Sequence, residues 1–195
     1  MNKTRLEAFS DGVFAIIITI MVLELKIPKS TEWEAIKELL PKLYCYLLSF
    51  IFIGIYWGNH HHLMHTVKKV TPGIMWANMH LLFWLSLVPF VTGWMGSNSF
   101  DKVTVATYGA LLFLSGLAYN ILSSIIKKSY KEETPLTRAI AKDNVKGYIS
   151  ASLYALSIPV ALFVHTGIAE ACFILVAILW IIPSKAIAKV LDELT

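Results

Sequence analysis

The sequence has few charged residues and none of the common motifs of an enzyme active site. Asp, Glu, Lys and Arg together make up 15% of the 195 residues. The sequence holds no GxxxxGKS or GxxxxGKT phosphate-binding loop, no GxSxG nucleophile motif and no HExxH zinc motif. The formal net charge of +4 is too small to indicate nucleic-acid binding. We therefore expect neither an enzyme nor a nucleic-acid-binding protein.

Cysteine is equally scarce. Cys45 and Cys172 both lie inside apolar stretches, and neither has a second cysteine at a CxxC spacing. Isolated cysteines of this kind behave as small apolar side chains rather than as redox or zinc-binding groups. We therefore expect no cofactor and no structural metal site.

Hydrophobic residues, by contrast, make up 56% of the chain, and the mean hydropathy is +0.63. They come in long blocks, and a helix needs about 20 apolar residues to cross the ~30 Å hydrocarbon core of a bilayer. We therefore predict an all-α polytopic membrane protein that forms a single domain over residues 1–195. Its six transmembrane helices are predicted at residues 9–25, 43–59, 74–94, 103–126, 147–164 and 168–182.

The stretches between the predicted spans are more polar. Residues 33–40 mix Trp, Ile and Leu with Glu and Lys, which favours a short amphipathic helix on the membrane surface. Residues 127–146 form the most charged loop, and residues 184–195 form a short amphipathic tail. We predict both termini on the cytoplasmic side of the cell membrane, because twelve of the 17 Lys and Arg residues then lie inside.

The first span places four residues on one face of a helix, at spacings of three, four and seven residues: Ile16, Thr19, Ile20 and Leu23. An apolar helix face commonly packs in the core of its own bundle. It can also line a pore together with copies of itself. The spacing alone leaves both interpretations open.

Two polar residues precede this face. Asp11 lies about 140° around an ideal helix from Ile16, so its side chain is predicted to point toward its own bundle. Polar groups within a membrane are costly unless they are paired. We therefore expect Ser10 and Asp11 to form hydrogen bonds that hold the helix in place, with three candidate partners: Trp57, Asn78 and His80.

The start of the first span carries a short motif, Arg5-x-x-x-Phe9-Ser10-Asp11. It resembles the RxxxFSD motif of the transmembrane protein 175 family, which contains the lysosomal potassium channel of animals and its bacterial relatives. The resemblance implies that the motif braces the first helix beside the pore. It also implies a potassium-permeable cation channel in which the first helix of each subunit lines the pore.

The resemblance also implies roles for the stripe on the first helix. Ile16 falls at the aliphatic constriction, and Ile20 and Leu23 continue the pore wall. Thr19 falls at a layer where a hydroxyl replaces part of the ion's hydration. The sequence has no TVGYG-like filter, so the hydrophobic constriction is expected to gate by dewetting, with modest selectivity for K⁺ over Na⁺. The expected assembly is a homotetramer in the lipid bilayer that passes monovalent cations.

A histidine cluster at residues 60–62, with His65, raises the question of a metal site. Only His61 and His65 share a helical face, and no acid or cysteine lies beside them. A solvated helix end on the cytoplasmic side is the simpler interpretation.

Two functions of other classes remain as alternatives. A proton-coupled secondary transporter normally has an ionisable site near the membrane midplane and internal repeats, and the sequence shows neither clearly. A membrane scaffold that transports nothing would fold in the same way. Measurement of ion flux separates both from a channel.

Overall fold

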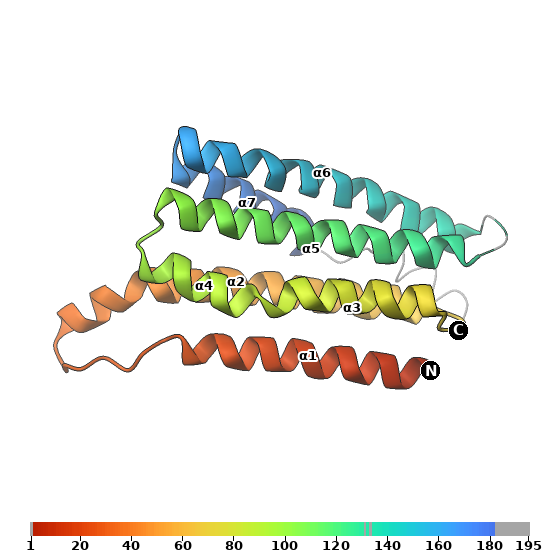
Figure 1. Cartoon of the computed structure of the whole chain (residues 1–195), viewed down its shortest axis with the longest axis horizontal. Coiled ribbons are helices and arrows are strands. Elements are labelled where there is room, and N and C mark those ends of the chain that lie inside the picture. Colours follow the sequence, from red (N-terminus) through yellow and green to blue (C-terminus); the bar gives the residue numbers. More distant parts are fainter. Residues whose placement is uncertain (1, 131, 133, 182–195) are drawn as a thin grey trace.

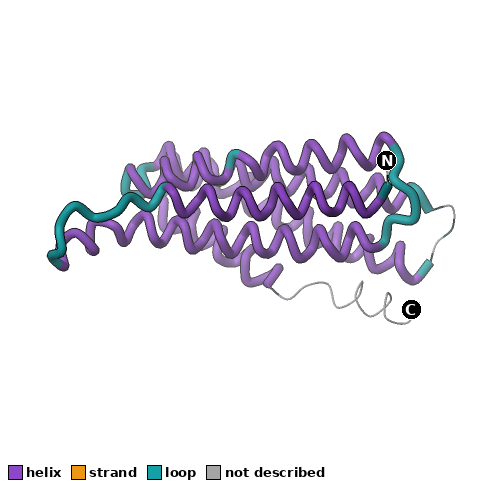
Figure 2. Tube along the Cα trace, turned by 90° about the horizontal axis from the view of Figure 1, so that it is seen from below, coloured by secondary structure: helices purple, strands orange, loops and turns teal. Residues whose placement is uncertain are grey.

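The computed structural model describes residues 2–130, 132 and 134–181. All regular secondary structure in these residues is α-helical, and the helices run side by side along the long axis of the molecule (Figures 1 and 2). They are α1 (Lys3–Leu23), α2 (Trp33–His65), α3 (Pro72–Ser86), α4 (Val88–Ser97), α5 (Lys102–Lys128), α6 (Pro135–Phe163) and α7 (Thr166–Ile181). The predicted amphipathic tail at residues 184–195 lies outside the described residues.

The helices have the length and composition of membrane spans. Five stretches of the described chain are long and apolar enough to cross a bilayer, with α3 and α4 together forming one of them. The described part of α7 is a shorter apolar helix of 16 residues. The structure therefore confirms an all-α polytopic membrane protein, while the count of six spans stays a prediction.

The prediction of a separate surface helix at residues 33–40 is wrong. These residues form the first turns of α2, which continues through Pro41 to His65. Proline is tolerated inside membrane helices because neighbouring groups satisfy the freed backbone carbonyl. The charged side chains of Glu34 and Lys37 are exposed, and Glu34 Oε1 lies 3.4 Å from Lys37 Nζ.

The predicted charged loop at residues 127–146 is also much shorter in the structure. Helix α5 continues to Lys128, and α6 begins at Pro135. A capping box fixes this start: the Thr134 hydroxyl accepts from the Thr137 amide at 3.2 Å, and the Thr137 hydroxyl accepts from the Thr134 amide at 2.8 Å. Proline suits the first helical position because its missing N–H has no partner there.

The span predicted at residues 74–94 is divided into two helices. Helix α3 ends at Ser86, and α4 begins at Val88, with Pro89 as its second residue. Proline within a helix lacks the amide hydrogen and clashes with the carbonyl four residues earlier. Leu87 instead directs its amide back to the carbonyls of Trp84 and Leu85, which closes the end of α3.

A buried set of hydroxyl groups joins three helices in the core. Ser49 Oγ on α2 lies 2.7 Å from Thr92 Oγ1 on α4 and 2.9 Å from the Tyr108 hydroxyl on α5. In a membrane, association between helices relies on close packing and such interhelical hydrogen bonds, because lipid is as apolar as the side chains. These contacts hold α2, α4 and α5 together as a frame.

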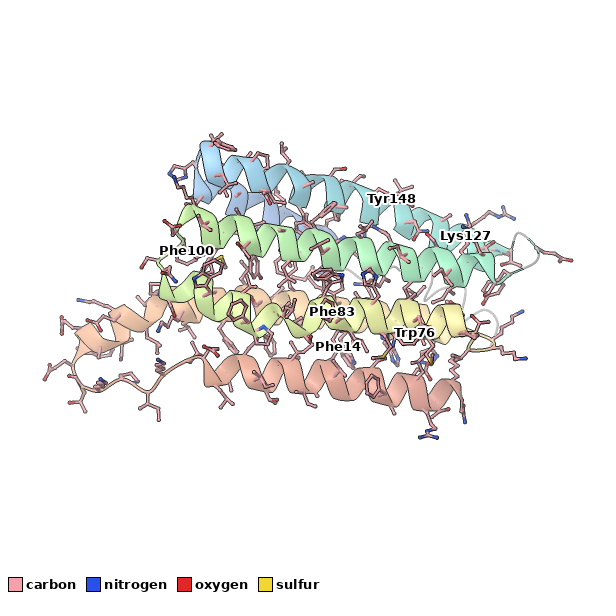
Figure 3. The ribbon with its side chains drawn as sticks, viewed as in Figure 1. Phe14, Trp76, Phe83, Phe100, Lys127 and Tyr148 are labelled. Atoms are coloured by element: carbon pink, nitrogen blue, oxygen red, sulfur yellow. The ribbon has the colours of Figure 1, made fainter. Side chains whose placement is uncertain are left out.

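Helix α1 lies at one edge of this frame, and α6 lies at the opposite edge (Figure 1). One face of α1 is buried against α2, α3 and α4 through five residues at helical spacing: Leu6, Ser10, Phe14, Ile17 and Met21. Phe14 points from α1 into the bundle (Figure 3). The described part of the chain leaves the opposite face of α1 uncovered.

Candidate functional site

The predicted stripe lies on the uncovered face of α1. The exposed fractions of Ile16, Ile20 and Leu23 are 57%, 45% and 76%, and Thr19 is also exposed. The neighbouring Ile17 is only 3% exposed. The interpretation of the stripe as part of the chain's own core is therefore wrong, because that core is formed by the other face of α1.

The Thr19 side chain has a defined orientation. Its hydroxyl donates a hydrogen bond to the Ile16 carbonyl at 2.9 Å. This bond uses the hydroxyl's single donor, so the lone pairs of Oγ1 remain available. Thr19 can therefore offer an oxygen ligand to a cation on the exposed side of α1.

A shallow groove runs along the base of the stripe, between α1 and the junction of α3 with α4. Its residues are Val13, Ile16, Ile17, Ile20, Glu24, Ser86, Pro89 and Phe90. Helix α3 also carries large exposed side chains such as Phe83 (Figure 3), and Phe90 of the groove is 67% exposed. The apolar surface around the stripe therefore extends onto the neighbouring helices.

Ser10 is the end of a buried hydrogen-bonded chain. Its hydroxyl donates to the Leu6 carbonyl and accepts from Asn78 Nδ2, both at 2.9 Å. Asn78 Oδ1 lies 2.7 Å from Nε2 of His60. Because the Asn78 oxygen can only accept, His60 donates through Nε2. The predicted contact between Ser10 and Asn78 is present, and it links α1 to α3 and α2.

Asp11 forms the second predicted contact of the motif. The indole nitrogen of Trp57 on α2 donates to Asp11 Oδ1 at 2.9 Å. Both residues are exposed, so this bond lies at the edge of the bundle rather than inside it. It still orients Asp11 toward its own bundle, as the helical geometry predicts.

The other motif residues lie on the uncovered surface. Phe9 is 51% exposed, and Arg5 is exposed as well. The described part of the chain therefore offers them no buried packing site. Their bracing role stays a prediction about the assembled protein.

Two histidines differ from expectation: His80, a predicted buried partner of the motif, is exposed, and His60, predicted at a solvated helix end, is buried. His80 is exposed and accepts a hydrogen bond at 2.8 Å from Trp84, one turn along α3. His60 is not a solvated helix end, because it is 1% exposed and bonded to Asn78. A signal for this was available: Leu63 and Met64 follow His60 at helical spacing and continue the buried face.

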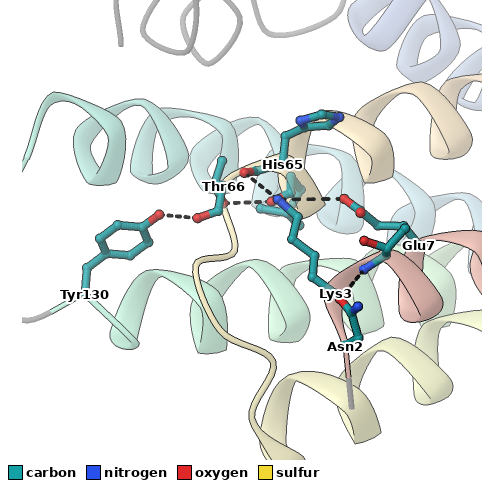
Figure 4. A network of polar contacts seen from close by, with 8 residues as sticks. Asn2, Lys3, Glu7, His65, Thr66 and Tyr130 are labelled. Atoms are coloured by element: carbon teal, nitrogen blue, oxygen red, sulfur yellow. Dashed lines mark hydrogen bonds and ion pairs between the residues drawn. The ribbon is translucent and has the colours of Figure 1, made fainter. Parts of the chain in front are cut away.

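A second polar network holds the first turn of α1 (Figure 4). The Lys3 ammonium donates to the His65 carbonyl at 3.0 Å and lies 3.9 Å from the Glu7 carboxylate. The Tyr130 hydroxyl donates to the Thr66 carbonyl, and burial raises the pKa of Tyr130. The start of α1 and the segment after α5 are thus both tied to the end of α2.

Comparison with known proteins identifies the family. The family described as the endosomal/lysosomal potassium channel TMEM175 matches residues 5–89. A protein from a Chryseobacterium strain, named as a potassium channel, is 51% identical over 99% of this chain and 100% of its own length. A Gallus gallus protein named as the endosomal/lysosomal proton channel TMEM175 is 26% identical over 79% of this chain and 34% of its own length.

The fold has a close counterpart of known structure. The crystal structure of a lysosomal potassium-selective channel TMEM175 homolog from Chamaesiphon minutus superposes with a TM-score of 0.82. The match covers 94% of this chain and 98% of the other, at 24% sequence identity. Together with the 51% identity to a full-length relative and the match over residues 5–89, it shows that this chain belongs to the TMEM175 family.

Proposed function

We propose that this chain is the subunit of a potassium-permeable cation channel in which α1 of each copy lines a central pore. The observation that carries the proposal is the exposure of Ile16, Thr19, Ile20 and Leu23 on one face of α1. The names of the bacterial relatives support potassium as the permeant ion. The family is one of ion channels rather than enzymes, in accord with the missing catalytic motifs.

The pore would be shaped by aliphatic side chains and one layer of hydroxyl groups. Ile16 would form the narrowest ring, where a hydrophobic neck excludes water when it is closed. Thr19 would place its free lone pairs toward the ion one turn later, in partial exchange for hydration water. Ile20 and Leu23 would continue the wall toward the far side of the membrane.

A pore of this kind requires several copies of the chain. A single α1 at the edge of the bundle provides only one side of a conduit (Figure 1). Identical subunits usually close such a structure by cyclic symmetry. We propose a homotetramer in the cell membrane, with both termini in the cytoplasm, in contact with lipid, monovalent cations and its own copies.

The motif would hold α1 at the correct angle to this axis. The chain of Ser10, Asn78 and His60 fixes α1 against α3 and α2, and Asp11 is held by Trp57. Arg5 and Phe9 are exposed in the single chain, and in the assembly they would brace α1 against a neighbouring copy. None of these residues would touch the ion in this arrangement.

Proton permeation is the second candidate, because the animal relatives are named as proton channels.

A proton-coupled transporter and a scaffold without transport would differ from a channel in their ion flux. A transporter would saturate and stop without a proton gradient, and a scaffold would give no flux at all.

The test is K⁺ flux from liposomes that contain the purified protein. We expect the wild type to conduct, Ile16→Asn to raise flux or relax selectivity, and Ile16→Trp to block it. Ile178→Asn is the matched control, because Ile178 on α7 is 60% exposed and far along the chain from the stripe. If both Ile16 variants fold and conduct like the wild type, the constriction is not at Ile16.

A further inference from the structure

We propose that His61 and His65, near the end of α2, form a binding site for a divalent transition-metal ion. The two residues are one helical turn apart, and both side chains are exposed. Their ring centroids lie 4.5 Å apart at an interplanar angle of 66°. This inference goes beyond the proposed ion channel and does not depend on it.

The distance between the two rings is the one that chelation requires. A metal ion lies about 2.0–2.1 Å from a bound imidazole nitrogen, and hence roughly 3.2 Å from the ring centroid. Two imidazoles bound at a right angle then have centroids roughly 4.5 Å apart. The observed 4.5 Å agrees with this value, so the two rings lie close enough to share one metal ion.

The neighbouring histidines are arranged differently. His60 is buried, and its Nε2 is committed to Asn78. The His62 ring lies 5.9 Å from that of His61, which is farther than the His65 ring. The His65 ring points away from Lys3 and Glu7 (Figure 4), and both His61 and His65 are exposed. The pair is therefore accessible to a metal ion from solution.

The ligand set selects the class of metal. Imidazole nitrogen favours Cu²⁺, Ni²⁺ and Zn²⁺, with Cu²⁺ bound most tightly, and it does not suit Mg²⁺ or Ca²⁺. In the described residues, no group of three or more His, Cys, Asp or Glu side chains could hold a metal ion. Water would therefore fill the remaining positions, as in an open site rather than a closed structural one.

The position of the pair connects it to α1. Trp57, which donates to Asp11, lies one turn before His61, and their rings are 6.2 Å apart. The His65 carbonyl accepts from Lys3. A metal that cross-links the last turn of α2 would therefore stiffen the backbone that holds the start of α1.

The experiment is Cu²⁺ titration of the purified full-length protein, prepared without a polyhistidine tag, with calorimetry and electron paramagnetic resonance as readouts. We expect one Cu²⁺ per chain with nitrogen coordination. His61→Gln and His65→Gln should each lose affinity on the order of 100-fold, because a second tethered ligand raises avidity by about that factor. His80→Gln and His62→Gln are the matched controls and should bind as the wild type does.

A second readout is thermal unfolding with and without Cu²⁺. A ligand that binds only the folded protein raises its melting temperature. We expect this rise in the wild type and in His80→Gln but not in the His61→Gln, His65→Gln double variant. The proposal fails if the double variant keeps the affinity and the thermal shift of the wild type, or if His80→Gln loses them equally.

Discussion

Asn78 lies between two buried side chains from different helices. Its amide nitrogen donates to Ser10 on α1, and its oxygen accepts from His60 on α2. All three residues are buried, so none of them can exchange its partner for water. Loss of Asn78 therefore leaves the buried Nε2–H of His60 without its acceptor and removes the donor to Ser10 Oγ, whose own hydroxyl stays bonded to the Leu6 carbonyl. A buried donor without a partner costs more than one net hydrogen bond.

Replacement of Asn78 by Leu, which has a similar volume, isolates this effect. We expect a destabilisation of about 1–3 kcal/mol, chiefly from the unpaired Nε2–H of His60, measured by thermal unfolding in detergent. Asn98→Leu is the control, since Asn98 is exposed and its side chain donates to the Trp94 carbonyl one turn earlier in the chain. Equal melting temperatures for the two variants would contradict a structural role for the chain of hydrogen bonds.

The sequence identified Ser10, Asn78 and Trp57 correctly as members of these contacts but selected His80 in place of His60. Periodicity assigns a residue to a face of its own helix. It does not give the relative height of two helices, and that height brings His60 of α2 to Asn78 of α3. His80 follows Asn78 by two residues, so it lies about 200° around α3 from Asn78. The contacts of Ser10 with Asn78 and of Asp11 with Trp57 were predictable from the chain alone, whereas the contact of His60 with Asn78 required the packing of α2 against α3.

Helices α2 and α4 approach each other closely at Gly96. A Cβ atom on Gly96 would lie 2.9 Å from the Cα of Lys42, which is backbone and cannot rotate away. Glycine is therefore required here by the distance between two helices, in the manner typical of membrane bundles.

Gly96→Ala should force α2 and α4 apart. We expect a loss of stability of about 1–3 kcal/mol, the usual effect of overpacking, again seen in thermal unfolding. Gly116→Ala on α5 is the matched control, because a Cβ there meets its nearest neighbour, the Tyr56 hydroxyl, at 3.7 Å. The control should be neutral or slightly stabilising, since alanine favours helix. A Gly96→Ala variant as stable as the control would rule out the close approach.

The apolar blocks predicted where helices lie but not where they end. Residues 33–40 and 135–146 are polar enough to look like surface segments, yet both belong to long helices that extend beyond the apolar region. Their ends depend on local hydrogen bonds such as the Thr134 capping box, which mean hydropathy does not register. Pro89 was the one available signal for the break between α3 and α4.

At the scale of the whole molecule, an apolar face of α1 lies on the outside of the bundle. Within a membrane, lipid can cover such a face, and so can another copy of the chain. The hydropathy of a single chain is the same whether lipid or another copy covers this face. The sequence could therefore predict the stripe but not what covers it. The tetramer therefore rests on family resemblance and needs a direct test.

Cross-linking tests the assembly. With Cys172 replaced by Ser and a single Leu23→Cys change, a short bis-maleimide reagent in membranes should link copies of the chain, because Leu23 would face the shared axis. Leu175→Cys on α7 is the control, since Leu175 is also exposed, at 59%. We expect oligomeric bands for Leu23→Cys only. Monomers alone, or equal bands for both, would contradict a shared axis lined by α1.

Helix α1 is attached unevenly along its length. In the described chain, its side chains that hydrogen-bond to other helices are Lys3, Ser10 and Asp11, while residues 12–23 are held by apolar packing. Among the described residues, hydrogen bonds to other helices thus fix the first half of α1, and its second half is held by packing alone. At 1.5 Å per residue, Leu23 lies about 18 Å beyond Asp11, so a tilt of roughly 10° about Asp11 moves it about 3 Å and Ile16 about 1.3 Å. In the proposed pore, a small rotation of α1 would therefore widen the end lined by Leu23 more than the constriction at Ile16.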